Sequence, residues 1–271
     1  MTYGIILLFY DYYSEKAVRE FKYLLERVDP DYRLIIVDNH GGIANVGEKV
    51  IRGNNINWEF SGWDTGLSTL STINDSDVFI FCNDTFCHHN TWNASIRERF
   101  CKVFRSLVKN NKQKSSAILS GTTDSVWKGF SLSEKKFNYW VSSYLFLMTG
   151  SLLNKMGGRL CIEEEILNRY ISMDSENNLV WGSEVSFSLQ SHLTRWLFED
   201  GEDVGWYNKR NISFEKKIRK VKAIFNEKYL TANCLFCGGR VIEVMPLKKM
   251  KMLIWRLLSK FNCWESVCDK K

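Results

Sequence analysis

The sequence predicts an α/β protein with a mostly parallel sheet flanked by helices and a helical appendage at its C-terminal end. Apolar runs of strand length at residues 4–9, 34–37 and 78–82 are typical of strands buried on both faces. Apolar residues at helical spacing between the first two runs indicate a helix that connects them. Polar or acidic residues follow each run, as they do at the carboxyl edge of a parallel sheet.

The first half of the chain gives a regular alternation of elements. Ser14 is a residue type that caps helices, and Asp29–Pro30 is a combination that ends them. The glycines at residues 62 and 66 favour a turn or a close backbone approach. We therefore expect, in order, a strand at 4–9, a helix at 14–28, a strand at 34–37, a short strand at 56–60, a turn or a close backbone approach at 61–66, a helix at 67–73 and a strand at 78–82.

The second half of the chain continues with helices and strands of less regular spacing. Thr91 is expected to cap a helix whose apolar face ends at Val108. Pro246 is expected in the first turn of a last helix, where proline is tolerated. Between them we expect strands at 117–119 and 139–149 and helices at 163–170 and 185–197.

Length and composition are enough for one large folded domain or for one domain with an appendage. The chain has 271 residues, 45% of them hydrophobic, and a net charge of +6, which favours anionic partners. Its N-terminal apolar run is too short for a signal peptide, and no apolar run is long enough to span a membrane. Eight cysteines are then expected as thiols in the cytoplasm. We expect a catalytic domain at 1–230 and an appendage at 231–271.

A polar cluster, Asn83-Asp84-Thr85, follows the central buried strand. In an open α/β sheet, ligands bind outside the carboxyl ends of the strands. Mg²⁺ prefers one or two carboxylates together with substrate phosphate oxygens. Asp84 is therefore a candidate ligand for a cation that carries a diphosphate, and the alternative is that Asn83 and Asp84 form an ordinary turn.

Four motifs in order along the chain carry a resemblance to a known family. They are Leu34-Ile35-Ile36-Val37-Asp38-Asn39, Glu59-Phe60-Ser61-Gly62-Trp63-Asp64-Thr65-Gly66, Phe81-Cys82-Asn83-Asp84-Thr85 and Ser142-Ser143-Tyr144-Leu145-Phe146. Over about residues 3 to 200 the chain resembles bacterial glycosyltransferases of the rhamnan synthesis F type, which are family-2-like enzymes with a GT-A fold. The resemblance implies a Rossmann-like sheet that binds a nucleotide-sugar.

The resemblance also implies roles for individual residues on the donor side. Asp38 is expected to contact the base or ribose, Tyr10 to stack on the base, and Asp64 and Asn83 to face the nucleotide-sugar donor. Asp84 falls where the family has an Asp-x-Asp metal motif, although here only the second acid is present. Mg²⁺ or Mn²⁺ is therefore the expected cofactor. The alternatives are a helix cap for Asp38, a core position for Tyr10 and a turn for Asp64.

The expected general base is Glu184. The segment Gly182-Ser183-Glu184-Val185-Ser186-Phe187-Ser188-Leu189 partly matches an acidic signature in which the second acid deprotonates the acceptor hydroxyl. An inverting transfer needs one carboxylate that takes this proton as the hydroxyl attacks. The alternative is an acidic residue in the first turn of a helix, where the helix dipole favours it.

Two further groups are candidates for metal binding. Cys234 and Cys237 form a CxxC pair that, with Cys263 and Cys268, offers four thiolates for a zinc ion, although the second pair is spaced more widely. His88 and His89 are adjacent on an expected loop and would converge poorly on one metal. We expect the cysteines to be free thiols, and we expect the two histidines to lie on the surface or to contact the acceptor.

The C-terminal helix is expected to lie on a membrane surface. From Leu247 to Phe261 its apolar residues share one face, and basic residues lie elsewhere without an acid among them. The alternative is a helix that packs on the catalytic domain. Nucleic-acid binding is not expected, because no known module for it is present.

The expected function is transfer of a sugar, with rhamnose as the guess from the resemblance, from a nucleotide diphosphate to a hydroxyl of a glycan or lipid-linked glycan. The expected location is the cytoplasmic face of the cell membrane, and the expected outcome is inversion. Because the acidic motifs are incomplete, the alternative is a non-catalytic nucleotide-sugar-binding or scaffold subunit.

Overall fold

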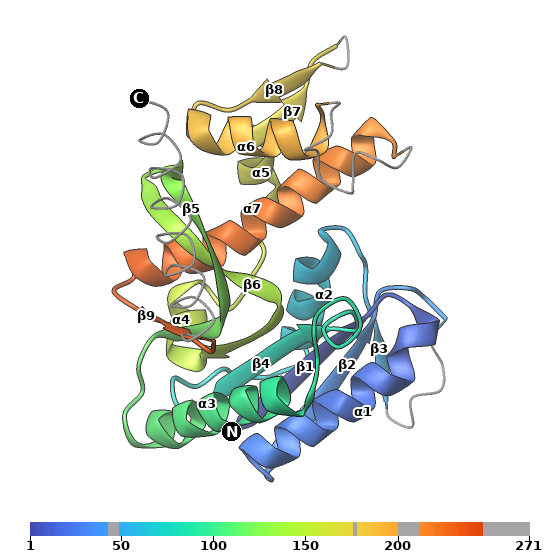
Figure 1. Ribbon diagram of the computed structural model, residues 1–271, viewed down its shortest axis with the longest axis vertical. Helices are drawn as coiled ribbons and strands as arrows, with labels where there is room; N and C mark the ends of the chain where they lie inside the picture. The colour runs from blue at the N-terminus through green and yellow to red at the C-terminus, as the bar shows by residue number, and fades with distance from the viewer. Residues whose placement is uncertain (43–48, 176–177, 200–211, 246–271) are drawn as a thin grey trace, which may run out of the picture.

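The computed structural model describes residues 1–42, 49–175, 178–199 and 212–245. Its main feature is a seven-stranded sheet in the order β3-β2-β1-β4-β6-β5-β9, beside a separate hairpin of β7 and β8 (Figure 1). The strands are β1 (Thr2–Leu8), β2 (Tyr32–Asp38), β3 (Val50–Arg52), β4 (Val78–Asn83), β5 (Ile118–Leu132), β6 (Lys135–Thr149), β7 (Ile171–Met173), β8 (Leu179–Trp181) and β9 (Arg240–Glu243). The helices are α1 (Asp11–Val28), α2 (Trp58–Leu67), α3 (Ala94–Gln113), α4 (Gly150–Lys155), α5 (Glu164–Tyr170), α6 (Phe187–Leu197) and α7 (Phe214–Phe236).

The sheet is mixed but mostly parallel, as the apolar strands predicted. Strands β1 and β2, β1 and β4, β2 and β3, and β5 and β9 pair in parallel. The exception is β6, which runs antiparallel to both β4 and β5. The four strands β3-β2-β1-β4 therefore form a Rossmann-like half, in which the chain order reverses between β1 and β4.

Helices cover both faces of this sheet and bury its two rows of side chains. On one face α1 and α3 lie against each other and cover Ile6 and Leu8 of β1 (Figure 1). On the other face α2, α4 and the second half of α7 cover Ile5 and Leu7. Alternate residues of β1 thus belong to opposite cores, which is why its sequence is apolar throughout.

A third core lies beyond the sheet. The outer half of the β5–β6 hairpin packs there with α5, α6, the β7–β8 hairpin and the first half of α7. Leu132, Leu167, Leu189 and Phe225 are among its fully or almost fully buried members. Because α7 contributes to this core and to the sheet, it joins the two parts of the molecule (Figure 1).

The prediction for residues 56–73 was wrong. The structure has neither a strand at 56–60 nor a helix at 67–73, because residues 58–67 form α2. Glycines 62 and 66 lie within this helix and face the sheet. A Cβ atom on Gly62 would lie 2.3 Å from Leu7 Cδ1, and one on Gly66 would lie 2.8 Å from Ile5 Cγ2. Of the two roles predicted for these glycines, the close backbone approach is therefore confirmed and the turn is wrong.

Replacing Gly62 with alanine is expected to lower the free energy of unfolding by about 1–3 kcal/mol, because the added methyl overpacks the contact with β1. Urea denaturation measures this change. Gly129→Ala is the matched control, since its Cβ would meet its nearest atom, Phe137 O, at an ordinary 3.7 Å. Equal stability of the two variants would contradict the close approach of α2.

Several predicted boundaries also shift. Helix α1 begins at Asp11, so Ser14 lies inside it and donates to Asp11 O instead of capping it. Helix α3 is capped by Asn93, not Thr91, through Ile96 N. Helix α7 was not predicted at all. The domain boundary expected after residue 230 falls inside α7, and β9, from the expected appendage, joins the main sheet.

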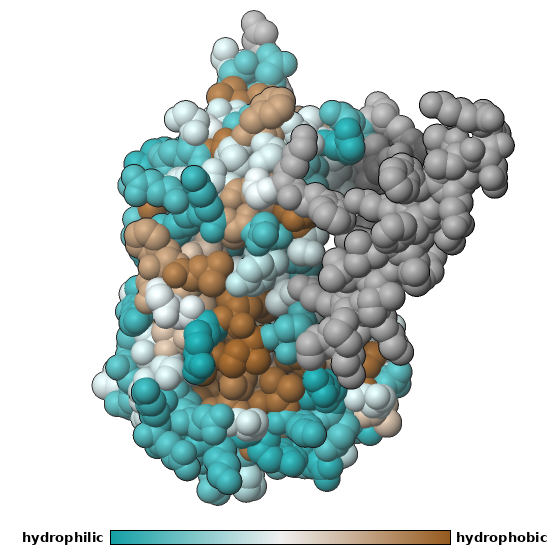
Figure 2. All heavy atoms as spheres, turned by 60° about the vertical axis from the view of Figure 1, so that its left-hand side comes forward, coloured by the Kyte–Doolittle hydropathy of each residue, from teal (hydrophilic) through white to brown (hydrophobic). Residues whose placement is uncertain are grey.

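The surface is mostly hydrophilic where Figure 2 shows it, with one hydrophobic patch in the lower half of that face. Among the described residues, no helix has both the length and the apolar composition that crossing a bilayer requires. The expected amphipathic helix from Pro246, together with Cys263 and Cys268, lies outside the described residues.

Candidate ligand site at the carboxyl edge of the sheet

The reversal of chain order between β1 and β4 defines the place where a ligand is expected. From β1 the chain passes through α1 to β2 on one side, whereas β4 lies on the other side. The connections therefore diverge from the carboxyl ends of β1 and β4. In open α/β sheets a ligand binds at this switch point.

Asp84 lies at this switch point, directly after β4. Its backbone N–H donates to Leu7 O at 2.9 Å, which continues the pairing with β1. Its Oδ2 accepts hydrogen bonds of 2.7 Å from the backbone N–H groups of Phe9 and Tyr10. The residue is fully buried, and its Oδ1 has no hydrogen-bond partner among the described residues. One carboxylate oxygen thus fixes the end of β1, and the other is buried with its hydrogen-bonding capacity unsatisfied among the described residues.

The surroundings of Asp84 disfavour its negative charge. Burial raises the pKa of this carboxyl to about 6. The negative charge of Glu59 also raises this pKa, whereas the hydrogen bonds from the N–H groups of Tyr10 and Phe9 lower it. Glu59 lies in the first turn of α2, and within the described residues it makes neither a hydrogen bond nor an ion pair. A like-charge pair with a raised pKa at the switch point of a sheet is a marker of a functional site.

Exposed aromatic rings surround the end of β1. Tyr10 is 40% exposed and Tyr12 is 74% exposed. The ring centroid of Tyr10 lies 5.6 Å from that of Tyr12 and 5.4 Å from that of Tyr13. Tyr13 in turn stacks on His88 at 4.0 Å and contacts His89. This group presents flat apolar surfaces beside the buried acid, so Tyr10 is not an enclosed core residue.

Asn83 and Asp38 lie at the same edge, but their side-chain oxygens already have local partners. Asn83 Oδ1 accepts from Thr85 Oγ1 at 2.7 Å. The carboxylate of Asp38 accepts hydrogen bonds of 2.8 Å from the backbone N–H groups of His40, Gly41 and Gly42. Asp38 therefore holds the glycine loop after β2, a role close to the alternative of a cap.

Asp64 faces away from the switch point. Its two oxygens accept from Leu160 N at 2.7 Å and Cys161 N at 3.0 Å, which ties α2 to the loop after α4. Burial raises its pKa against these hydrogen bonds. In the motif that carries both acids, Glu59 is therefore the one near Asp84, and sequence reasoning assigned it no role.

Glu184 lies in the outer part of the molecule. It precedes α6, which begins at Phe187, and its Oε2 accepts from Ser133 Oγ at 2.7 Å in the β5–β6 turn. Arg169 Nε is 3.7 Å from Oε1. Cys82 of β4 pairs with Leu145 of the antiparallel β6, so Ser143 lies level with Asp84. Lys135, beside the β5–β6 turn, precedes Ser143 by eight residues, which is roughly 25 Å of extended strand. The structure thus does not bring Glu184 to the edge that carries Asp84.

A buried ion pair on α7 also escaped the sequence analysis. Glu227 Oε1 accepts from Ser143 N at 2.9 Å and Ser143 Oγ at 3.0 Å, and Lys228 Nζ lies 3.3 Å from Glu227 Oε2. Burial opposes ionisation of Glu227, but Lys228 and Ser143 hold its pKa below the ordinary value. Such a carboxylate is a poor proton acceptor at neutral pH. The pair braces β6 where its register with β5 shifts.

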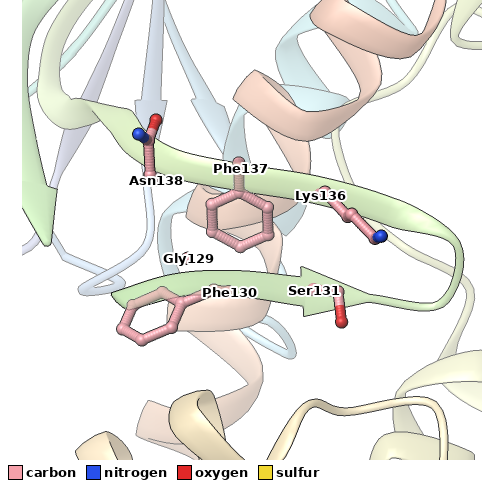
Figure 3. A pocket seen from close by; sticks show the side chains of 6 residues that line it. All are labelled: Gly129, Phe130, Ser131, Lys136, Phe137 and Asn138. Atoms are coloured by element: carbon pink, nitrogen blue, oxygen red, sulfur yellow. The ribbon is translucent and has the colours of Figure 1, made fainter. Parts of the chain in front are cut away.

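A shallow pocket of about 400 Å³ lies on the β5–β6 hairpin (Figure 3). It is lined by Gly129, Phe130, Ser131, Lys136, Phe137 and Asn138. Both rings are almost fully buried, and no lining residue is acidic. It therefore offers neither an open aromatic face nor a catalytic carboxylate.

The structure thus brings Tyr10, Asp38, Asn83 and Asp84 to one edge, adds Glu59, and places Asp64 and Glu184 elsewhere. Within the described residues no group of three or more His, Cys, Asp or Glu side chains converges as a metal site. Cys234 is buried and Cys237 half-buried, both as free thiols. No family model matches the chain, and no curated protein matches its sequence.

Proposed function

We propose that the protein is a glycosyltransferase of GT-A type that binds a nucleotide diphosphate sugar at the carboxyl ends of β1 and β4. The observation that carries the proposal is the buried, partnerless oxygen of Asp84 beside Glu59 at the switch point of the sheet. A divalent cation is bound by carboxylate oxygens of this kind, and the cation in turn binds the phosphate oxygens of a diphosphate. The order of the four motifs, which resembles rhamnan synthesis F-type enzymes, supports the same conclusion.

The residues present fit a divalent cation that also binds substrate. Asp84 and Glu59 would hold Mg²⁺ or Mn²⁺, since these ions use one or two carboxylates and complete their shell with phosphate and water. When bound, the cation supplies neutralisation of the diphosphate charge. The chain itself orients the site, because Asp84 Oδ2 is fixed by Phe9 and Tyr10. The exposed Tyr10 and Tyr12 rings offer stacking surfaces for the base.

The acceptor in this proposal is a hydroxyl of a bacterial surface glycan or lipid-linked glycan, met at the inner face of the cell membrane through the segment from Pro246. The sugar transferred is rhamnose by resemblance, with inversion from a single displacement. We do not retain Glu184 as the base, since its contacts are with Ser133 and Arg169.

A second candidate is a nucleotide-sugar-binding subunit without transferase activity. The position of Glu184 favours it, because a site that binds the donor but lacks a base beside it would bind without transfer. Both candidates use the same donor site and differ in turnover.

Donor turnover tests the proposal. Purified protein should hydrolyse or transfer from a nucleotide diphosphate sugar in the presence of Mn²⁺ and an acceptor mixture. Asp84→Asn should lower that rate at least about 100-fold, since metal and charge stabilisation contribute several kcal/mol. Asp31→Asn, an exposed acid at the other end of the strands, should leave it unchanged. Donor binding without turnover would select the second candidate. The absence of both donor binding and turnover would exclude both candidates.

A further inference from the structure

A basic pocket lies at the opposite edge of the sheet from Asp84. It has a volume of about 430 Å³, and its polar lining comes from Lys114, Ser115, Ser116, Ser151, Lys155 and Arg240. Strand β5 runs antiparallel to β6, which runs antiparallel to β4, so β5 points the same way as β4. The pocket lies at the start of β5 and β9 and is thus separate from the proposed donor site.

Three separate segments bring the cations of this pocket together. Lys114 follows α3, Lys155 ends α4, and Arg240 begins β9 after the turn that ends α7. Arg240 is held there because its backbone N–H donates to Ala117 O at 2.9 Å. None of the lining residues is acidic, and within the described chain none of the three cations forms an ion pair with a carboxylate.

Helix dipoles alone do not balance this charge. The carboxyl ends of α3, α4 and α7 all lie at the pocket. Each helix end carries at most about half a negative elementary charge. Three cations therefore leave an excess of roughly one and a half positive charges. Among the described residues, Lys155 is the one of these three side chains that donates to a helix-end carbonyl, that of Cys237, at 3.1 Å.

The pocket also offers hydroxyl donors. Ser116 Oγ has a weak contact of 3.4 Å with Lys114 O, whereas the hydroxyls of Ser115 and Ser151 have no partner among the described residues. Phosphate oxygens accept hydrogen bonds from both hydroxyls and cations, and arginine pairs with them through two parallel N–H groups.

We propose that this pocket binds a phosphate group, held by Arg240, Lys114 and Lys155 with the serine hydroxyls. The inference is independent of the proposed transferase, because it uses none of the residues of the β1–β4 edge. The phosphate belongs either to a soluble phosphorylated molecule or to a lipid headgroup, and both sources present the same oxygens.

Calorimetric titration of the full chain with inorganic phosphate and with pyrophosphate, in EDTA to silence any metal-dependent site, tests the proposal. We expect saturable binding that Arg240→Gln and Lys114→Gln each weaken about tenfold or more. Lys102→Gln, which removes the same charge from an exposed position on α3, should leave the affinity unchanged, and so should Asp84→Asn. Circular dichroism and melting temperature confirm that each variant is folded.

Vesicles of phosphatidylcholine with and without phosphatidic acid separate the two sources. A lipid source predicts binding to the phosphatidic acid vesicles that pyrophosphate displaces and Arg240→Gln weakens. A soluble source predicts anion binding that such vesicles do not compete for. The proposal fails if neither anion nor vesicle binds saturably, if Lys102→Gln weakens binding as much as Arg240→Gln, or if Asp84→Asn abolishes it.

Discussion

Replacing Lys228 with methionine is expected to lower the free energy of unfolding by about 3–5 kcal/mol, because it leaves the largely buried carboxylate of Glu227, whose side chain is 20% exposed, without its counter-ion. The side chain of Lys228 is 4% exposed and lies 3.3 Å from Glu227 Oε2. Its Nζ also lies 3.0 Å from the centroid of the Trp140 ring. Methionine keeps the contact with Trp140 but removes the charge. Urea denaturation near neutral pH measures the difference.

A double variant provides the internal control for this prediction. In Glu227→Gln/Lys228→Met both charges are gone, so most of the stability lost in the single variant should return. Lys216→Met, at an exposed position of the same helix, should have little effect. If Lys228→Met were as stable as the wild type, the ion pair would not stabilise the packing of α7 on β6.

The same lysine predicts a dependence on pH. Burial lowers the pKa of Lys228 to about 8 in the folded protein, below its ordinary value. Between the folded and the unfolded pKa the unfolded chain therefore binds more protons, and stability rises with pH in that window. This rise should be absent from Lys228→Met.

Replacing Asp84 with asparagine is expected to remove a loss of stability that the wild type suffers as pH rises. Burial and Glu59 raise the pKa of Asp84 to about 6, so the folded protein holds its proton more tightly than the unfolded chain does. Stability is lost as pH rises from the unfolded toward the folded pKa. A shift of about two units corresponds to about 3 kcal/mol. Relative to wild type, Asp84→Asn should gain about this much between pH 4 and pH 7.

This prediction compares one variant at two pH values, so constant effects of the new amide cancel. The asparagine oxygen can still accept from Phe9 and Tyr10, which keeps the end of β1 in place. Asp31→Asn, an exposed acid, should show no such change with pH. If the free energies of unfolding of wild type and Asp84→Asn changed with pH in parallel, the pKa of Asp84 would not be raised in the folded protein.

The parallel strands and the position of Asp84 were accessible from the sequence. The strands β1 and β4 are buried on both faces, and this burial produces the continuous apolar runs that predicted them. Polar residues that follow such a run mark the carboxyl edge. The antiparallel direction of β6 was not accessible, because strand direction depends on the connections between elements and not on local pattern.

Helix α2 shows why local rules failed at the site. Glycines 62 and 66 favour a turn by their backbone freedom, but here the missing Cβ allows a helix to approach β1. That packing turns Asp64 toward Leu160 and places Glu59 near Asp84. Which of the two acids reaches the site is therefore decided by contacts between distant segments.

Helix α7 was not predicted from the sequence because its buried face is partly polar. Asn226, Lys228, Thr231 and Asn233 are all buried in it, and they interrupt the apolar spacing that identifies a helix. Three of them have partners from outside the helix: Asn226 accepts from Ile162 N, Thr231 accepts from Val141 N, and Lys228 lies over the ring of Trp140. Pairings of this kind are visible only once the fold is known.

Titration of the protein with a nucleoside diphosphate, UDP or dTDP, in the presence and absence of Mn²⁺ tests the role of Asp84 most directly. The account predicts saturable, metal-dependent binding to the wild type and to Asp31→Asn, and affinity at least about tenfold weaker for Asp84→Asn. Equal affinity of the wild type and Asp84→Asn for the metal-bound nucleotide would contradict it.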